Sequence, residues 1–221
     1  MNAVSIALWG DDPMYVRGAE RAARMWREAL GAGWEVHLVT NKPNFNPEYA
    51  AMTWYIKFTD WGGAFARYAL GTLKKQGVSG NLENYFDRVI FRDADSVPVP
   101  RDVWAVQDWC KSEVPFMVIR DHPGHAMVPG GLWGLRPNDD FTVAYHGWES
   151  EYPHPKFWDD QRWLRARVWP LMERKGVEIY DSARLDAACP RLTDWDFCGN
   201  KFDAYGKAVY HDDRVPQSRA R

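Results

Sequence analysis

The chain has 221 residues, with 28 Lys and Arg against 30 Asp and Glu, and a formal net charge of −2. This length favours one sizeable domain, and we expect residues 1–221 to form it. The apolar fraction of 46% excludes a disordered chain, and the lack of a basic excess argues against a general nucleic-acid clamp. The unusual feature is the aromatic content of 15%, because aromatic residues line sugar and base sites but also fill cores.

The sequence contains no targeting or membrane signal of the common kinds. The first ten residues lack a basic segment and carry only a short apolar run, which is typical of a strand and not of a signal peptide. No run approaches the ~18 apolar residues of a membrane span. The three cysteines, Cys110, Cys189 and Cys198, lie far apart and match no zinc spacing. We therefore expect free thiols and a cytoplasmic location.

The first elements along the chain alternate between strand and helix. Residues 4–8 form a short apolar run that ends at a Gly-Asp-Asp-Pro turn, which predicts a strand. Residues 15–30 have apolar side chains at helical spacing and stop before Gly31 and Gly33. Residues 34–40 predict a second strand, and residues 64–75 predict a helix after Gly62 and Gly63.

The same alternation continues to residue 180. We expect strands over 87–92, 115–120 and 177–180, and helices over 101–111 and 158–174. Strands alternating with helices indicate an α/β domain with a mostly parallel sheet flanked by helices. Because ligands bind at the carboxyl ends of such strands, the aspartates that follow them should gather at one edge. Residues 190–221 are interrupted by Pro and Gly and show less apolar periodicity, and we expect them to form a lid or a tail.

The most informative segment is the apolar strand that ends in Asp93-Ala94-Asp95. It delivers two carboxylates, two residues apart, into the loop that follows. Hard oxygen ligands of this kind suit Mn²⁺ or Mg²⁺, which bind one or two carboxylates, waters and substrate phosphates. A solvated turn is the ordinary alternative, because Asp is common at strand ends.

Four segments, taken in order, resemble nucleotide-sugar glycosyltransferases of the GT-A fold. They are Gly10-Asp11-Asp12-Pro13-Met14-Tyr15, Ala66-Arg67-Tyr68, Arg92-Asp93-Ala94-Asp95-Ser96 and Asp160-Gln161. A glycine-rich stretch, Pro129-Gly130-Gly131-Leu132-Trp133-Gly134, lies between the last two. The likeness is closest to small bacterial and viral glycosyltransferase-like proteins and more distant to the glycogenin and lipopolysaccharide-galactosyltransferase group. It implies a single Rossmann-like GT-A domain.

The resemblance also implies roles for individual residues. It suggests a donor site for a nucleotide diphosphate sugar made of Asp11, Asp12, Tyr15, Arg67, Asp93, Ala94, Gly130 and Gly131. Asp160 is the expected catalytic carboxylate, with Asp159 next in line, since a carboxylate stabilises an oxocarbenium-like transition state or takes the acceptor's proton. Gln161 is expected to face the acceptor.

Two further sites remain less determined by the sequence. Asp121 and His122, in an Asp-His-Pro-Gly-His turn, are expected to line the acceptor pocket, although the histidines could also bind metal. Asp93 and Asp95 should share the metal with a third ligand. The related group has a His there, where this chain has Asp196, and His211 is the alternative ligand that we favour.

Other readings of the sequence stay open. The Asp93-Ala94-Asp95-Ser96-Val97 run also fits the nucleophile motif of haloacid-dehalogenase-type phosphatases, though that motif normally opens its fold. A non-catalytic domain that binds nucleotide sugars is a second alternative. A base-glycosylating enzyme is a third, suggested only by a basic helix (Arg162, Arg165, Arg167, Arg174 and Lys175). The acceptor itself, which could be a glycan, lipid, protein or nucleic-acid base, is not predicted.

The tryptophans divide into two groups. Trp26, Trp104, Trp109 and Trp163 fall at apolar positions of expected helices and should be core. Three others lie beside expected site loops and are candidates for stacking on a base or sugar: Trp9, Trp61 and Trp133.

Overall fold

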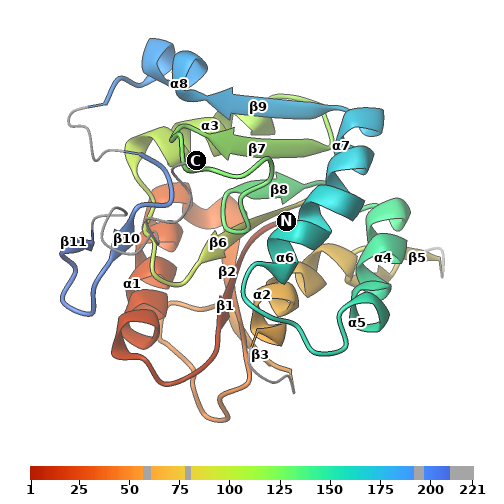
Figure 1. Cartoon of the computed structure of the whole chain (residues 1–221), viewed down its shortest axis with the longest axis horizontal. Coiled ribbons are helices and arrows are strands. Elements are labelled where there is room, and N and C mark those ends of the chain that lie inside the picture. The colour runs from red at the N-terminus through yellow and green to blue at the C-terminus, as the bar shows by residue number, and fades with distance from the viewer. Residues whose placement is uncertain (57–60, 78–80, 192–196, 210–221) are drawn as a thin grey trace, which may run out of the picture.

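The computed structural model describes residues 1–56, 61–77, 81–191 and 197–209. This part of the chain forms a seven-stranded sheet in the order β3-β2-β1-β6-β8-β7-β9, with helices on both faces (Figure 1). The strands are β1 (Asn2–Leu8), β2 (Trp34–Thr40), β3 (Met52–Tyr55), β6 (Arg88–Asp93), β7 (Phe116–Arg120), β8 (Trp133–Leu135) and β9 (Val177–Asp181). Only β8 runs antiparallel to its neighbours β6 and β7. The expected α/β class with a mostly parallel sheet is confirmed.

The helices form two layers, each with its own apolar core. One face is covered by α1 (Pro13–Leu30), α3 (Pro100–Cys110) and α8 (Ser182–Ala188). The other face is covered by α2 (Gly62–Ala66), the 3-10 helix η2 (Arg67–Thr72), α4 (Asp139–His146), α6 (Asp159–Trp163), the π-helix η3 (Leu164–Val168) and α7 (Trp169–Lys175). Residues of β6 alternate between these cores, with Ile90 on the α1 side and Phe91 on the α2 side.

The remaining elements are short. They are η1 (Gly31–Gly33), the hairpin of β4 (Lys74–Gln76) and β5 (Leu82–Asn84), α5 (Trp148–Glu151), and the hairpin of β10 (Lys201–Phe202) and β11 (Ala208–Val209). The second hairpin belongs to the segment expected to be a lid or a tail. It lies beside the loop after β6, where Ser96 pairs with Lys201.

Helix α1 begins and ends where the sequence signals predict. The Asp12 side chain accepts a hydrogen bond from the Met14 N–H at 2.9 Å, and Pro13 occupies the first turn. The helix ends at Gly31, whose φ of 69° suits glycine. Its buried face includes the small residues Gly18 and Ala22, so it packs closely on the sheet and on the loop after β6.

Two of the expected helices differ from the structure. Residues 64–75 are not one helix: α2 passes into a 3-10 helix at Arg67, and residues 74–76 are a strand that pairs with β5. The helix expected over 158–174 is continuous from Asp159 to Lys175 but contains the π-helical stretch η3. Pro170 follows this stretch and has no N–H for the α-helical bond to the carbonyl four residues earlier, which disfavours the regular pattern there.

No helix in the described residues is long and apolar enough to cross a membrane.

Candidate active site

A cavity of about 270 Å³ opens at the carboxyl ends of β1 and β6. Its wall combines the loop after β6, the start of η2, the 129–132 loop, the start of α6 and the 199–201 segment. The structure therefore brings Tyr15, Arg67, Ala94, Gly130 and Gly131 into one wall, together with the three carboxylates at Asp93, Asp95 and Asp160 and the amide of Gln161. Each of these was a site candidate from the sequence.

Arg67 joins two of the cavity's carboxylates. Its side chain is 5% exposed, its Nη1 contacts Asp93 Oδ1, and its Nη2 lies 3.5 Å from Asp160 Oδ2. Arg67 Nε also donates to the Ala64 carbonyl at 3.0 Å, and Ser5 Oγ donates to the Arg67 carbonyl at 2.6 Å. These contacts anchor Arg67 to both α2 and β1.

The charges around Arg67 shift the pKa values of Arg67 and of its partner Asp93. Burial alone would lower the pKa of Arg67, but the neighbouring Asp93, Tyr68 and Asp160 outweigh it and raise that pKa. Burial alone would likewise raise the pKa of Asp93, but the Arg67 guanidinium lowers it. The pair is therefore a fixed cation beside a fixed anion.

Asp95 has a cationic partner that the sequence reading missed. Lys201 Nζ lies 3.1 Å from Asp95 Oδ2, and the Phe202 N–H donates to the Asp95 carbonyl at 2.9 Å. Asp95 is only 1% exposed. Its burial raises its pKa in spite of Lys201, so the carboxylate lacks the solvation that ionised groups prefer. The local sequence holds no sign of this pair, because it depends on how β10 docks against the loop after β6.

Glycines set how closely the backbone approaches the two aspartates. A Cβ on Gly18 of α1 would lie 2.4 Å from the Ala94 carbonyl oxygen. A Cβ on Gly131 would lie 2.3 Å from Asp93 Oδ2, and one on Gly130 would lie 2.9 Å from Asp160 Oδ2. Side chains at these positions would displace the aspartate loop or fill the space beside the carboxylates.

Gln161 holds the glycine-rich loop. In one orientation of its side-chain amide, both the oxygen and the nitrogen form hydrogen bonds. The oxygen then accepts from the Gly130 N–H at 2.7 Å, and the nitrogen donates to the Val128 carbonyl at 3.0 Å. Its expected contact with an acceptor remains a prediction, but its polar atoms already have partners on the loop.

Asp160 and Asp159 have different surroundings although they are neighbours. Asp160 lies in the cavity wall, where its Oδ2 is 3.4 Å from the Tyr68 hydroxyl, and burial raises its pKa against the effect of Arg67. The Asp159 carboxylate instead accepts the Lys156 N–H at 2.7 Å and pairs with Arg162 at 2.8 Å. Asp159 is therefore a local structural residue at the start of α6.

The acidic loop after β1 is not gathered into the cavity wall as expected. Asp12 caps α1, and the Asp11 side chain is 97% exposed and pairs with Lys42. Only Tyr15 from this group lines the cavity. Its pKa is raised by burial and then by the nearby Asp95.

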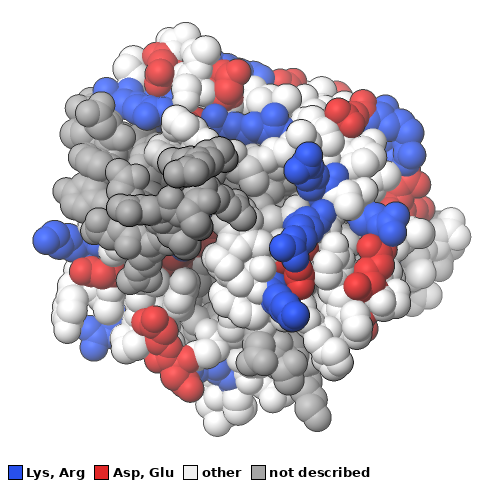
Figure 2. Space-filling model, viewed as in Figure 1, with Lys and Arg blue, Asp and Glu red and all other residues white. Residues whose placement is uncertain are grey.

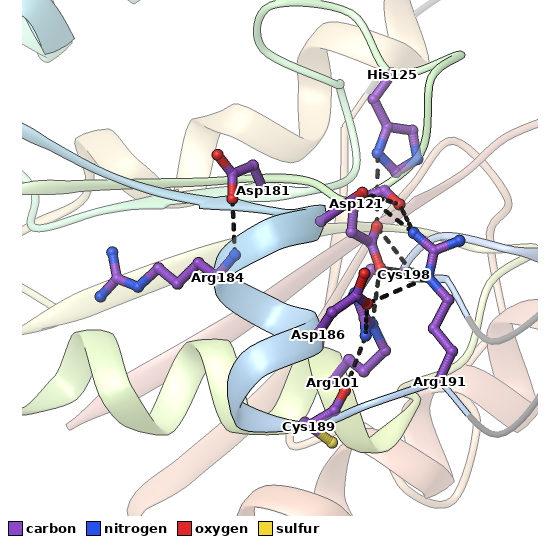
Figure 3. Close-up of polar contacts among 10 residues, drawn as sticks. Arg101, Asp121, His125, Asp181, Arg184, Asp186, Cys189, Arg191 and Cys198 are labelled. Carbon is purple, nitrogen blue, oxygen red and sulfur yellow. Dashed lines mark hydrogen bonds and ion pairs between the residues drawn. The ribbon is translucent and has the colours of Figure 1, made fainter.

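Asp121 is completely buried and belongs to the polar network drawn in Figure 3. Its carboxylate accepts the Cys198 N–H at 3.0 Å and the Arg101 Nε–H at 3.2 Å, and lies 3.7 Å from His125 Nδ1. With 0% exposure it offers no surface to an acceptor, contrary to our expectation for this residue. Its contact with Cys198 instead anchors the segment that carries Lys201.

The two histidines after β7 have different surroundings. The His122 ring stacks on Phe197 with centroids 4.3 Å apart, and His122 does not line the cavity. His125, which the sequence offered only as an alternative metal ligand together with His122, does line it. His122 therefore does not contact the cavity directly, contrary to the acceptor role that we expected for it.

The residues at the end of β6 fit a divalent metal ion. Asp93 and Asp95 provide two hard oxygen donors in the cavity wall, and the absence of a Cβ on Gly131 makes room for the Asp93 carboxylate there. Such ions commonly take one or two carboxylates and complete their coordination with water and substrate phosphates. Within the described residues no cluster of three His, Cys, Asp or Glu side chains is placed to hold a metal. Asp196 and His211, the two candidates for a third ligand, lie outside the described residues.

The division of the tryptophans is mostly as expected. Trp26, Trp109 and Trp163 are completely buried. Trp9 and Trp61 line the cavity, as do Phe157 and Trp158, which the sequence reading did not single out. The prediction that Trp133 is available for stacking is wrong: it is 0% exposed and packs against Tyr68 and Phe91.

The basic helix is largely neutralised by acidic neighbours. In Figure 2 the Lys and Arg side chains over α6 and α7 stand next to acidic ones. The ion pairs are Arg162 with Asp159, Arg167 with Glu151, and Arg174 and Lys175 with Asp140. This is the pattern of a solvated helix face, and it gives no support to a nucleic-acid acceptor.

The sequence matches no family model and no curated protein. Among solved structures, the chain is similar to 4-diphosphocytidyl-2C-methyl-D-erythritol synthase from Anaerococcus prevotii (9% identity, 87% of this chain and 91% of that one, TM-score 0.48). It is also similar to a putative nucleotide-diphospho-sugar transferase from Desulfovibrio desulfuricans (10% identity, 81% and 78%, TM-score 0.47).

A stronger similarity is to a glycosyltransferase involved in the glycosylation of the major capsid of PBCV-1. The identity is 11% over 81% of each chain, with a TM-score of 0.53. At this identity the similarity concerns the fold. The chain has the GT-A type of α/β fold, as the ordered motifs of its sequence implied.

Proposed function

We propose that the protein is a glycosyltransferase that moves a sugar from a nucleotide diphosphate sugar to an acceptor, with Mn²⁺ or Mg²⁺ as cofactor. The observation that carries this proposal is the convergence of five charged side chains in one cavity at the carboxyl end of β6: Asp93, Asp95, Asp160, Arg67 and Lys201. Two carboxylates for a metal, two cations and a further carboxylate are what transfer of a sugar from a diphosphate requires.

The chain's own residues supply the donor site in this proposal. Asp93 and Asp95 would hold the metal ion, which acts as a Lewis acid on the diphosphate. Arg67 and Lys201 lie beside these carboxylates and would contact the phosphate oxygens. When the bond between the sugar's anomeric carbon and the diphosphate oxygen breaks, its electron pair stays on the diphosphate, and these two cations oppose the growing negative charge.

Asp160 is the proposed catalytic residue. It faces the cavity from the start of α6 and is oriented by Arg67 and Tyr68. As the bond to the diphosphate breaks, positive charge develops on the sugar ring, and a carboxylate beside it stabilises that charge. The acceptor oxygen forms the new bond to the anomeric carbon and loses its proton, which Asp160 would accept.

The direct test is release of nucleotide diphosphate from a panel of nucleotide sugars, with Mn²⁺ and a mixture of saccharide acceptors. We expect turnover with one donor, and its loss in the Asp95→Ala variant although circular dichroism shows that this variant folds. Metal-dependent donor binding without turnover would instead support the non-catalytic alternative. Phosphate release from simple phosphomonoesters would support the phosphatase alternative.

A further inference from the structure

Four aromatic side chains form a continuous rim on one side of the cavity. Trp9, Trp61, Phe157 and Trp158, here called the aromatic rim, all line it. Their ring centroids are 6.0 Å apart for Trp9 and Trp61, 4.9 Å for Trp61 and Phe157, and 5.6 Å for Phe157 and Trp158. The rings therefore make one connected apolar surface drawn from three separate parts of the chain.

The aromatic rim is exposed to a degree that packing does not explain. Trp61 is 38% exposed, Trp158 42% and Phe157 61%, whereas most of the aromatic side chains in the described residues are buried or partly buried. Scattered exposed aromatics are ordinary, but a cluster around a cavity is the usual mark of a binding surface. Trp158 also has a φ of 74°, which is uncommon for a bulky residue and typical of positions held in place at ligand sites.

The aromatic rim is attached to the proposed catalytic groups. Trp61 and Arg67 both line the cavity from the two ends of the α2 segment, and Trp158 comes two residues before Asp160. The cavity's Lys and Arg side chains, Arg67 and Lys201, are paired with the carboxylates Asp93 and Asp95. Among the described residues, the cavity thus has a charged end suited to the diphosphate and an aromatic side suited to an uncharged group.

The ring geometry favours a saccharide over a nucleobase. The planes of successive rings in the rim meet at 69°, 55° and 84°. None of these three pairs therefore has parallel rings between which a flat base could stack. A pyranose is puckered, and the C–H groups on its faces carry the partial positive charge that aromatic faces attract. Tilted rings can contact such a ring from more than one side.

We propose that the aromatic rim is the acceptor subsite and that the acceptor is the end of a carbohydrate chain, with a sugar ring packed against Trp61, Phe157 and Trp158. This inference rests on the proposed glycosyl transfer and names its acceptor class. The hydroxyl group that attacks the donor would then enter the cavity on the side of Asp160.

The test uses saturation-transfer NMR and calorimetry on the full chain. The saccharide probes are methyl glucosides, galactosides and mannosides of both anomers, maltose and cellobiose, each with diamagnetic Mg²⁺ and with or without a saturating nucleotide diphosphate. Phe157→Ala and Trp61→Ala are the rim variants. Tyr55→Ala, which removes a 60% exposed aromatic side chain outside the cavity wall, is the matched control. Circular dichroism and thermal unfolding identify any variant that fails to fold, in which case the more exposed Phe157 decides.

We expect at least one saccharide to bind the parent, with about tenfold weaker binding in each rim variant and no change in Tyr55→Ala. Affinity for the nucleotide diphosphate should stay within about twofold throughout. Absence of saccharide binding to the parent would overturn the inference. So would a loss of nucleotide diphosphate affinity in the rim variants, which would make the rim a stacking surface for the base. If no nucleotide diphosphate binds the parent, the proposed function fails. The effect of the rim variants on saccharide binding then still decides whether the rim is a saccharide site.

Discussion

The ammonium group of Lys201 lies 3.1 Å from the buried carboxylate of Asp95, although the two residues come from opposite halves of the chain. The contact is supported on both sides, because Ser96 pairs with Lys201 and the Phe202 N–H bonds to the Asp95 carbonyl. The last described segment of the chain is thus joined directly to the proposed metal-binding loop. If the proposed function holds, this connection links donor binding to the position of this segment.

Lys201→Met should weaken binding of the nucleotide diphosphate about tenfold, since a charge-assisted contact to phosphate is lost. Lys207→Met is the matched control, because Lys207 lies in the same hairpin and is exposed. Calorimetric titration with Mn²⁺ gives both affinities. Equal affinities for the two variants would exclude a phosphate contact by Lys201.

Asp160→Asn should abolish sugar transfer while changing donor affinity less than threefold, because the amide can neither accept a proton nor carry the charge that stabilises the transition state. Asp159→Asn is the control in the neighbouring position. It should keep transfer but lower the unfolding free energy by about 1 kcal/mol, because it weakens the bonds to Lys156 and Arg162. Transfer assays and denaturant unfolding measure the two effects. Transfer by Asp160→Asn at the parent rate would remove Asp160 from the mechanism.

Gly18→Ala should lower the unfolding free energy by about 2 kcal/mol. The added Cβ would meet the Ala94 carbonyl oxygen at 2.4 Å, and a backbone contact cannot be relieved by a change of rotamer. Gly33→Ala, where nothing lies within 4 Å of the added Cβ, should change stability by less than about 0.5 kcal/mol. Urea unfolding compares the two. Similar values would show that α1 does not pack as tightly on the aspartate loop as described.

Stability should fall as the pH drops below about 6.5, with His37 contributing. The Trp54 Nε1–H donates to His37 Nδ1, and His37 Nε2 lies 3.0 Å from Glu35 Oε2, an arrangement that requires neutral imidazole. Burial lowers the pKa of His37 although Glu35 opposes it. The unfolded state therefore takes up a proton at a higher pH than the folded state does, and protonation favours unfolding.

His37→Asn cannot take up this proton. Its unfolding free energy should fall less steeply than the parent's between pH 6.5 and the lowered pKa, by up to about 1.4 kcal/mol per pH unit. Urea unfolding at several pH values gives both slopes. Parallel curves would mean that His37 titrates alike in the folded and unfolded states.

The sequence predicts the parts of this fold that depend on local pattern. The strands over residues 34–40 and 115–120 and the long α1 carry strong apolar periodicity and were expected nearly at their observed bounds. The three-residue β8 and the four-residue β3 are too short to show a period, and both were missed. The 3-10 helix after Ala66 was missed for a related reason, since its residues have ordinary helical propensity.

The candidate site also contains residues that local sequence identifies and residues that it does not. The Asp93 and Asp95 pair and the glycines Gly130 and Gly131 could be predicted, because each is recognisable within a few residues. Lys201 could not be, because its role appears only when distant segments come together. Asp121 was assigned to the acceptor side because it follows a strand, but its carboxylate turns inward to Arg101 and Cys198.

The central claim is that Asp93 and Asp95 hold a metal ion that binds a nucleotide diphosphate. Calorimetric titration of the parent and of Asp95→Asn with UDP, GDP, ADP and CDP, each with and without Mn²⁺, tests it most directly. Asp139→Asn, at an exposed site outside the cavity, is the control. The account predicts that one nucleotide binds the parent at least tenfold more tightly with Mn²⁺, and that Asp95→Asn alone loses this gain. Metal-independent binding, or equal binding by parent and Asp95→Asn, would contradict it.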